Sequence, residues 1–293
     1  MAATDAANAP QPTGKKQSRA GRDLPAAFAV GGTAGGMVIA TLAWAPRFWV
    51  VLCAGAILLA SHEVVRRLRE AGYVIPVIPL LVGGQLTVWL TVPYQETGAL
   101  AGFGVMVVVC IIWRLFMTGA GTECDVAPPS TYLRDVSATV FLATWVPLFI
   151  SFAALLVHGD SGASKVFCMM IAVVTSDIAG YTFGVLWGKH PMVPAISPKK
   201  SWEGFAGSMI CGITATILTT TLMVHKQWWV GALLGVLFVL TTALGDLVES
   251  QVKRDLGIKD MGRLMPGHGG LMDRIDGVLP SAVAAWTVLT LLP

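Results

Sequence analysis

Acidic and basic side chains gather near the C-terminal end of this sequence, in a pattern suited to binding a divalent cation and phosphate groups. Asp246 is followed by Glu249, Ser250 and Lys253 at positions i+3, i+4 and i+7, which share one face of a helix. A solvated helix end would show the same spacing. The stripe alone therefore leaves a structural and a chemical interpretation open.

Two further carboxylates favour the chemical interpretation. Asp273 and Asp276 stand at i and i+3 at the expected start of the last helix, so both can point the same way. The helix dipole stabilises negative charge there, so one of them could be a cap. A second carboxylate on the same face indicates a cation, and oxygen ligands suit Mg²⁺ or Mn²⁺. With Asp246 on a neighbouring helix, we expect a metal site formed by Asp246, Asp273 and Asp276.

Cations and glycines surround these acids in the sequence. The cations are Lys253, Arg254, Lys259 and Arg274. His268, Gly269 and Gly270 form a segment whose glycines permit close backbone approach. Carboxylates ringed by cations at a lipid boundary suit phosphoryl or nucleotidyl transfer to a lipid, because two polyanions must be brought together. A phosphate nucleophile needs no general base, so we assign His268 a binding or loop-shaping role.

Asp177 lies in the middle of an apolar interval, with 11 uncharged residues on either side. An ionised group at mid-bilayer costs at least ~2.5–3.5 kcal/mol, so such a residue is functional by default. The alternatives are a neutral Asp that is hydrogen-bonded to a neighbouring helix, or a helix end that lies nearer the membrane surface than the interval indicates.

The loop that follows this interval carries Ser197, Lys199 and Lys200 beside Pro198 and Ser201. Proline stiffens the loop, and the hydroxyls and lysines suit phosphate oxygens. A positively charged membrane anchor would have the same composition, so anchor and anion site both remain open.

Composition places these groups in a membrane protein. Of the 293 residues 55% are hydrophobic and 13% charged, and the mean hydropathy is +0.69. Soluble domains carry about 25% charged residues. We therefore expect an all-α, polytopic integral membrane protein. The net charge of +3 is not a nucleic-acid signature, so no nucleic-acid partner is expected.

Cutting the chain at its charges gives nine candidate transmembrane helices, each judged against the ~20 apolar residues that a span needs. They are residues 24–46, 48–62, 71–95, 97–113, 136–159, 166–188, 204–225, 227–245 and 277–293. The second is short and is expected to borrow a turn containing Arg47 or Glu63. The apolar stretch up to residue 157 is nearly featureless, so function is expected downstream.

The positive-inside rule supports nine crossings. With a cytoplasmic N-terminus, 17 of the 20 Lys and Arg residues face the cytoplasm, and only Arg47, Lys165 and Lys226 face the other side. Residues 1–23 are expected to be a disordered basic cytoplasmic tail, 24–157 the first five helices, and 158–293 four catalytic helices with their loops. We expect a multi-pass protein of the cell (inner) membrane, with its active site facing the cytoplasm.

The segment from Ser250 to Asp276 closely resembles the signature of the phosphatidate cytidylyltransferase family, also called CDP-diacylglycerol synthases. The matching residues are Ser250, Lys253, Arg254, Lys259, Asp260, Gly262, Pro266, His268, Gly269, Gly270, Asp273, Arg274 and Asp276. Asp177, Tyr181 and residues 197–200 match a second region of the family. Met265 departs from the usual Leu, Ile or Phe.

The resemblance implies that the protein condenses CTP with phosphatidate to give CDP-diacylglycerol and pyrophosphate. It also implies Mg²⁺, sometimes a second, monovalent cation such as K⁺, and a homodimer. The implied catalytic residues are Asp246, Lys253, Asp273 and Asp276, the acids also holding metal. The implied nucleotide-binding residues are Ser250, Lys253, Arg254, Lys259, His268, Gly269, Gly270 and Arg274. The implied lipid-binding residues are Asp177, Tyr181, Ser197, Lys199 and Lys200.

Three alternative functions remain at this point, and one of them is a catalytically inactive scaffold that only binds lipid. A related CTP-dependent polyprenol or phytol kinase would let an alcohol attack the γ-phosphorus instead. A cation-coupled secondary transporter could use Asp177 with Asp273 and Asp276.

Overall fold

The computed structural model describes residues 24–117, 131–159, 161–262 and 269–292. The predicted tail of residues 1–23 and His268 lie outside these ranges. Six helical stretches in the described residues are long and apolar enough to cross a membrane: Pro46–Glu70, Thr91–Phe116, Tyr132–Leu155, Gly162–Trp187, Trp202–Val224 and Trp228–Asp255. Shorter apolar helices, Gly35–Trp44, Val77–Trp89 and Val278–Leu291, lie within three other expected spans. The protein is therefore an α-helical membrane protein.

The second helix is longer than the sequence indicated. After α1 (Leu24–Trp44) and a 3₁₀ turn η1 (Pro46–Phe48), α2 runs from Trp49 to Glu70. Its last two turns are polar, and Glu70 pairs there with Arg66 at 2.9 Å and with Arg67 at 2.8 Å. Ion pairs at i+3 and i+4 stabilise a helix end that is in water. The expectation that this helix stops near residue 63 was wrong.

The third expected span is shorter than its apolar interval. α3 covers Val77–Trp89 and α4 covers Thr91–Phe116, with a non-helical Gln95 (φ 50°) inside α4. Pro76 immediately precedes α3, and proline suits a helix start rather than its interior. The apolar interval of residues 71–95 therefore contains a connection as well as a helix.

The remaining helices follow the expected order. They are α5 (Tyr132–Ala143), the π-helical η2 (Thr144–Leu148), α6 (Phe149–Leu155), α7 (Gly162–Trp187), α8 (Trp202–Thr219), the π-helical η3 (Thr220–Val224), α9 (Trp228–Asp255), α10 (Met272–Ile275) and α11 (Val278–Leu291). Pro147 lies in η2, where its missing N–H breaks the α-helical pattern. α9 continues ten residues beyond the expected end of its span and carries the acidic stripe on this extension.

The expected loop between α7 and α8 is a β-hairpin. Strands β1 (Pro191–Val193) and β2 (Ser197–Ser201) pair antiparallel, with Pro191 opposite Ser201. They are the only strands among the described residues. Ser201 also caps α8, since its Oγ accepts a hydrogen bond from the Gly204 N–H at 3.1 Å.

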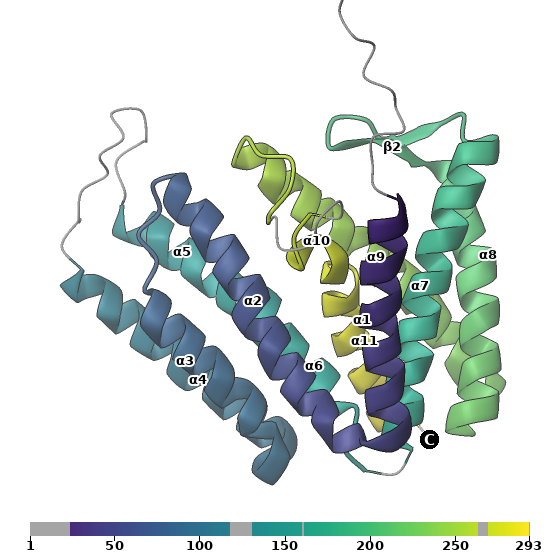
Figure 1. Ribbon diagram of the computed structural model, residues 1–293, viewed down its shortest axis with the longest axis horizontal. Coiled ribbons are helices and arrows are strands. Elements are labelled where there is room, and N and C mark those ends of the chain that lie inside the picture. Colours follow the sequence, from purple (N-terminus) through teal and green to yellow (C-terminus); the bar gives the residue numbers. More distant parts are fainter. Residues whose placement is uncertain (1–23, 118–130, 160, 263–268, 293) are drawn as a thin grey trace, which may run out of the picture.

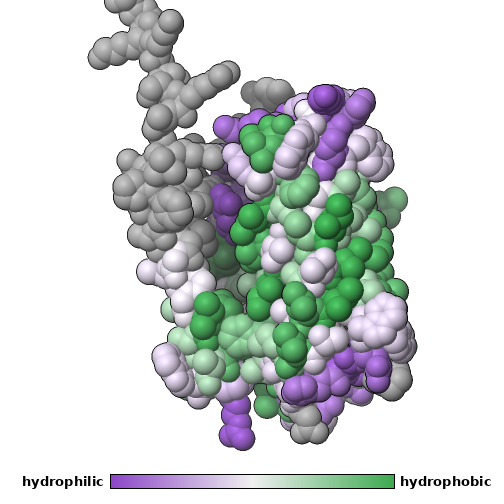
Figure 2. Space-filling model, turned by 90° about the vertical axis from the view of Figure 1, so that its right-hand side faces the viewer, coloured by the Kyte–Doolittle hydropathy of each residue, from purple (hydrophilic) through white to green (hydrophobic). Residues whose placement is uncertain are grey.

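The hairpin lies at one end of the helix bundle, α10 lies in the half of the bundle nearer to the hairpin, and α11 ends at the opposite end (Figure 1). Seen from the α7 and α8 side, the surface has a hydrophobic band between hydrophilic ends (Figure 2). This is the surface expected of helices that are surrounded by lipid. The polar side chains at the hairpin end are therefore held at the membrane boundary.

Candidate active site

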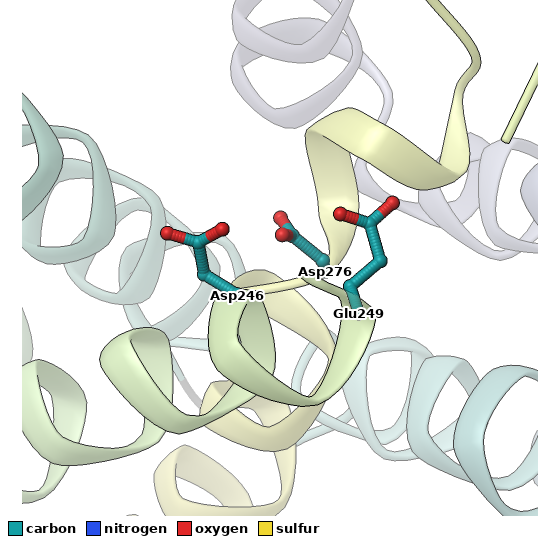
Figure 3. Close-up of side chains that lie close together, drawn as sticks. All are labelled: Asp246, Glu249 and Asp276. Atoms are coloured by element: carbon teal, nitrogen blue, oxygen red, sulfur yellow. The ribbon is translucent and has the colours of Figure 1, made fainter. Parts of the chain in front are cut away.

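Three carboxylates converge at the hairpin end of the bundle. Oxygen atoms of Asp246, Glu249 and Asp276 all lie within 4.8 Å of one another. Asp246 and Glu249 rise from one helix, α9, while Asp276 reaches between them from the end of α10 (Figure 3). Helical spacing brings the first two together, and the break between α10 and α11 brings the third.

The electrostatics of this cluster fit a divalent cation. Burial, reinforced by the negative charge of Asp246, raises the pKa of Asp276 to about 7. Glu249 is 1% exposed, and its Oε1 has no hydrogen-bond partner in the described part of the chain. Carboxylate oxygens are ligands that Mg²⁺ prefers, and three carboxylates offer them here within a small space. The donor set therefore fits the metal that the sequence analysis expected.

Asp273 has a different environment from Asp276. Its carboxylate pairs with the Lys253 ammonium at 2.9 Å and accepts the N–H groups of Gly270 at 2.8 Å and Met261 at 3.1 Å. Burial opposes its ionisation, but the Gly270 N–H and Lys253 hold the pKa of Asp273 below its ordinary value. Asp273 thus holds the residues just before α10 through its hydrogen bonds with Met261 and Gly270.

Glu249 is the acidic residue that the sequence analysis did not include among the metal ligands. It stands three residues after Asp246, so its position on the shared face was visible in the spacing. Lys253 pairs with Glu249 as well as with Asp273. One lysine therefore joins the acidic cluster to Asp273.

The hairpin joins the same site. Lys200 Nζ lies 2.5 Å from Asp246 Oδ2, across the gap between β2 and α9. A cavity of about 430 Å³ opens here. Its walls include the predicted lipid-binding residues Asp177, Tyr181, Ser197, Lys199 and Lys200, together with Asp246, Asp273, Arg274 and Asp276. Two regions far apart in the sequence therefore line one cavity.

Most of the other predicted nucleotide-binding residues lie outside the walls of this cavity. Among the described residues, Ser250, Lys253, Arg254 and Lys259 do not line its walls. Arg254 donates to the Ile196 carbonyl at 3.4 Å, which links α9 to the hairpin turn, and Lys259 is exposed. Gly269 has φ +85°, a conformation that favours glycine.

Close packing of α7 on α8 shapes the floor of the cavity. A Cβ added to Gly204 would lie 2.7 Å from the carbonyl oxygen of Gly180. One turn on, Ser208 Oγ donates to the Ser176 carbonyl at 2.7 Å. Small residues let the two backbones approach, as is usual between membrane helices.

The sequence is similar to known proteins over nearly its whole length. The sequence pattern of the cytidylyltransferase family matches residues 26–292. The chain belongs to this family. The chain is also 72% identical over 285 residues to the phosphatidate cytidylyltransferase of Mycobacterium leprae, covering 95% of this chain and 91% of that protein. These matches confirm the family predicted from the motif.

Similar proteins of this family match either nearly the whole chain or a shorter part of it. The phosphatidate cytidylyltransferase of Mycobacterium tuberculosis strain H37Rv is 70% identical over 291 residues, 98% of this chain and 89% of that protein. That of Staphylococcus epidermidis is 41% identical over 121 residues, 41% of this chain and 46% of that protein.

We predict that Gly204→Ala separates α7 from α8 and destabilises the protein by about 1–3 kcal/mol, the usual cost of overpacking. The measurement is thermal unfolding of the purified protein in detergent. Gly104→Ala on α4 is the matched control, because a Cβ there has no neighbour within 4 Å. Equal melting temperatures for the two variants would contradict the packing described here.

Proposed function

We propose that this protein transfers the cytidylyl group of CTP to phosphatidate, giving CDP-diacylglycerol and pyrophosphate. The observation that carries the proposal is the cavity whose walls include Asp246 and Asp276 of the acidic cluster together with the lysines of the hairpin. Family membership and the names of the similar mycobacterial proteins support the same reaction. The cavity lies at an end of the apolar bundle, where a soluble nucleotide and a membrane lipid can meet.

Asp246, Glu249 and Asp276 would hold Mg²⁺ or Mn²⁺ in this proposal. The bound cation would neutralise phosphate charge during transfer. Asp273, which the sequence analysis also placed among the ligands, would act beside them by fixing Lys253. The second, monovalent cation and the homodimer stay predictions from the family resemblance.

The cations of the site would bring the two anionic substrates together. Lys253, Arg254, Lys259 and Arg274, with Ser250 and the segment His268 to Gly270, would bind the triphosphate. Lys199, Lys200 and Ser197 would bind the phosphate of phosphatidate, with Asp177 and Tyr181 on α7 beside it. Neutralising both anions lowers the repulsion that otherwise keeps them apart.

The reaction then needs only correct placement of the two phosphates. An oxygen of the lipid phosphate forms a bond to the α-phosphorus of CTP while the bond from that phosphorus to the bridging oxygen breaks. Pyrophosphate leaves with the electron pair, opposite the attacking oxygen. The attacking oxygen is already ionised near neutral pH, so no side chain has to remove a proton.

We also propose nine crossings with a cytoplasmic N-terminus, and an active site on the cytoplasmic side of the cell membrane. Support comes from the cations at the hairpin end of the bundle (Figure 1): Arg66, Arg67 and Arg69 near the end of α2, Lys199 and Lys200 in β2, and Lys253 and Arg254 near the end of α9. Lys165 and Lys226 lie near the starts of α7 and α9, at the opposite end. Positive charge gathers on the cytoplasmic side of membrane proteins.

The purified protein, supplied with phosphatidate, Mg²⁺ and CTP labelled on the α-phosphate, is expected to release pyrophosphate and to move the label into lipid. A lipid kinase would instead release labelled CDP and leave the lipid unlabelled. Solute uptake into proteoliposomes without CTP consumption would indicate a transporter. Either of these results would overturn the proposed reaction.

Asp276→Ala is expected to lower the rate of cytidylyl transfer by more than about a hundredfold, because neutralisation of transition-state charge contributes several kcal/mol. The assay is pyrophosphate release, with thermal unfolding to show that the variant is folded. Asp255→Ala removes an exposed carboxylate at the end of α9 and should keep nearly full activity. Near-full turnover by the folded Asp276 variant would remove the metal assignment.

Labelling of introduced cysteines tests the orientation. In a Cys124→Ser background, Lys199→Cys should react with a membrane-impermeant maleimide in inside-out vesicles only. Gln227→Cys, an exposed position just before α9, should react in right-side-out vesicles only. The reverse pattern would place the site on the opposite face of the membrane.

A further inference from the structure

Glu63 connects the N-terminal half of the chain to the site. It lies on α2 and is 8% exposed. Its Oε1 accepts the N–H of Leu271 at 3.1 Å and its Oε2 accepts the N–H of Met272 at 3.0 Å. These two groups begin α10, where backbone N–H groups have no partner within the helix. A carboxylate from a helix some 208 residues away in sequence therefore supplies the cap.

The loop before α10 is shaped around this carboxylate. A Cβ on Gly262 would overlap Glu63 Oε1, and a Cβ on Gly270 would lie 2.5 Å from Glu63 Oε2. The flanking side chains of Met261 and Met272 are 1% and 0% exposed. The Glu63 carboxylate thus lies against the backbone of Gly262 and of Gly270. A residue with a Cβ at either position could not come so close to it.

Arg67, one turn further along α2, holds the other side of the loop. Its Nε donates to the Met261 carbonyl at 2.8 Å and its Nη2 to the Asp260 carbonyl at 3.3 Å. Glu63 therefore binds N–H groups and Arg67 binds carbonyl groups of the same segment. Four hydrogen bonds from one helix face therefore hold the backbone at Asp260 and Met261 and at the start of α10.

We propose that Glu63, assisted by Arg67, is a positioning residue that keeps Asp276 beside the two carboxylates of α9. α10 is a single helical turn, so the position of its first residues sets the position of Asp276 directly after it. α9 holds Asp246 and Glu249 whether or not α10 is in place. The inference rests on the proposed metal site. It means that residues of the N-terminal half help to form that site.

The test is Mn²⁺ binding to the purified protein without CTP or lipid, measured by loss of the free-ion signal in electron paramagnetic resonance. In Glu63→Gln an amide NH₂ must face one of the two backbone N–H groups, so one hydrogen bond is lost. Residues that orient metal ligands typically change metal affinity 10–100-fold. We expect the Mn²⁺ dissociation constant to rise by at least about tenfold.

A second measurement separates positioning from general stability. Amide hydrogen exchange at Leu271 and Met272 should become faster in Glu63→Gln, while exchange within α7 and α8 stays unchanged. Glu96→Gln makes the same change at an exposed position on α4 and should alter neither measurement. A folded Glu63→Gln with wild-type Mn²⁺ affinity would overturn the proposal, as would faster exchange throughout the bundle.

Arg67→Gln keeps the proposal testable if Glu63→Gln does not fold. Its side chain is 19% exposed, and its loss removes two bonds to the loop without opening the core. It should raise the Mn²⁺ dissociation constant several-fold, and an unchanged constant would refute the role of α2. These readouts need no turnover, so failure of the wild-type protein to transfer cytidylyl groups would refute the proposed reaction and leave this inference standing.

Discussion

Three carboxylates cannot share a small, partly buried space unless something compensates their mutual repulsion, and the C-terminal half of this protein is arranged around that constraint. Asp246 and Glu249 are fixed by one helix, and Asp276 is brought to them by a break in the chain. Lys253 and Lys200 each pair with one member of the cluster. The arrangement concentrates negative charge where a divalent cation can bind and surrounds it with positive charge that suits phosphates.

The position of this cluster in the bundle matters as much as its composition. α9 extends beyond its apolar part, so its acidic turns lie at the membrane boundary. The β-hairpin between α7 and α8 places its lysines in the wall of the same cavity. The close approach of α7 and α8 at Gly180 and Gly204 sets the distance between these two helices. A soluble nucleotide can thus reach the site from water while the acyl chains of a lipid stay in the bilayer.

The two halves of the chain are less separate than their sequences indicate. The first half lacks the residues of the family signature, and none of the described residues that line the cavity belongs to it. Yet Glu63 and Arg67 of α2 contact the backbone of the segment that carries Asp273 and Asp276. A buried carboxylate is costly unless it is hydrogen-bonded, and the start of α10 supplies the donors for Glu63.

Much of this protein follows from its sequence. Low charge and long apolar intervals are enough to predict a helical membrane protein, because only helices and closed barrels satisfy the backbone within lipid. The signature from Ser250 to Asp276 identifies the family, and helical spacing places Asp246 beside Glu249. These properties depend on composition and on neighbours a few residues apart.

Other features depend on contacts between distant residues, which no local pattern contains. The sequence could not tell that Asp276, and not Asp273, joins Asp246 and Glu249, because the answer depends on the hydrogen bonds that Asp273 makes with the Gly270 N–H and with Lys253. The sequence also could not show that Lys200 pairs with Asp246, or that Glu63 accepts the N–H groups at the start of α10. Side-chain direction is decided by the path of the backbone and by donors from other helices, and both are set only when the helices pack together.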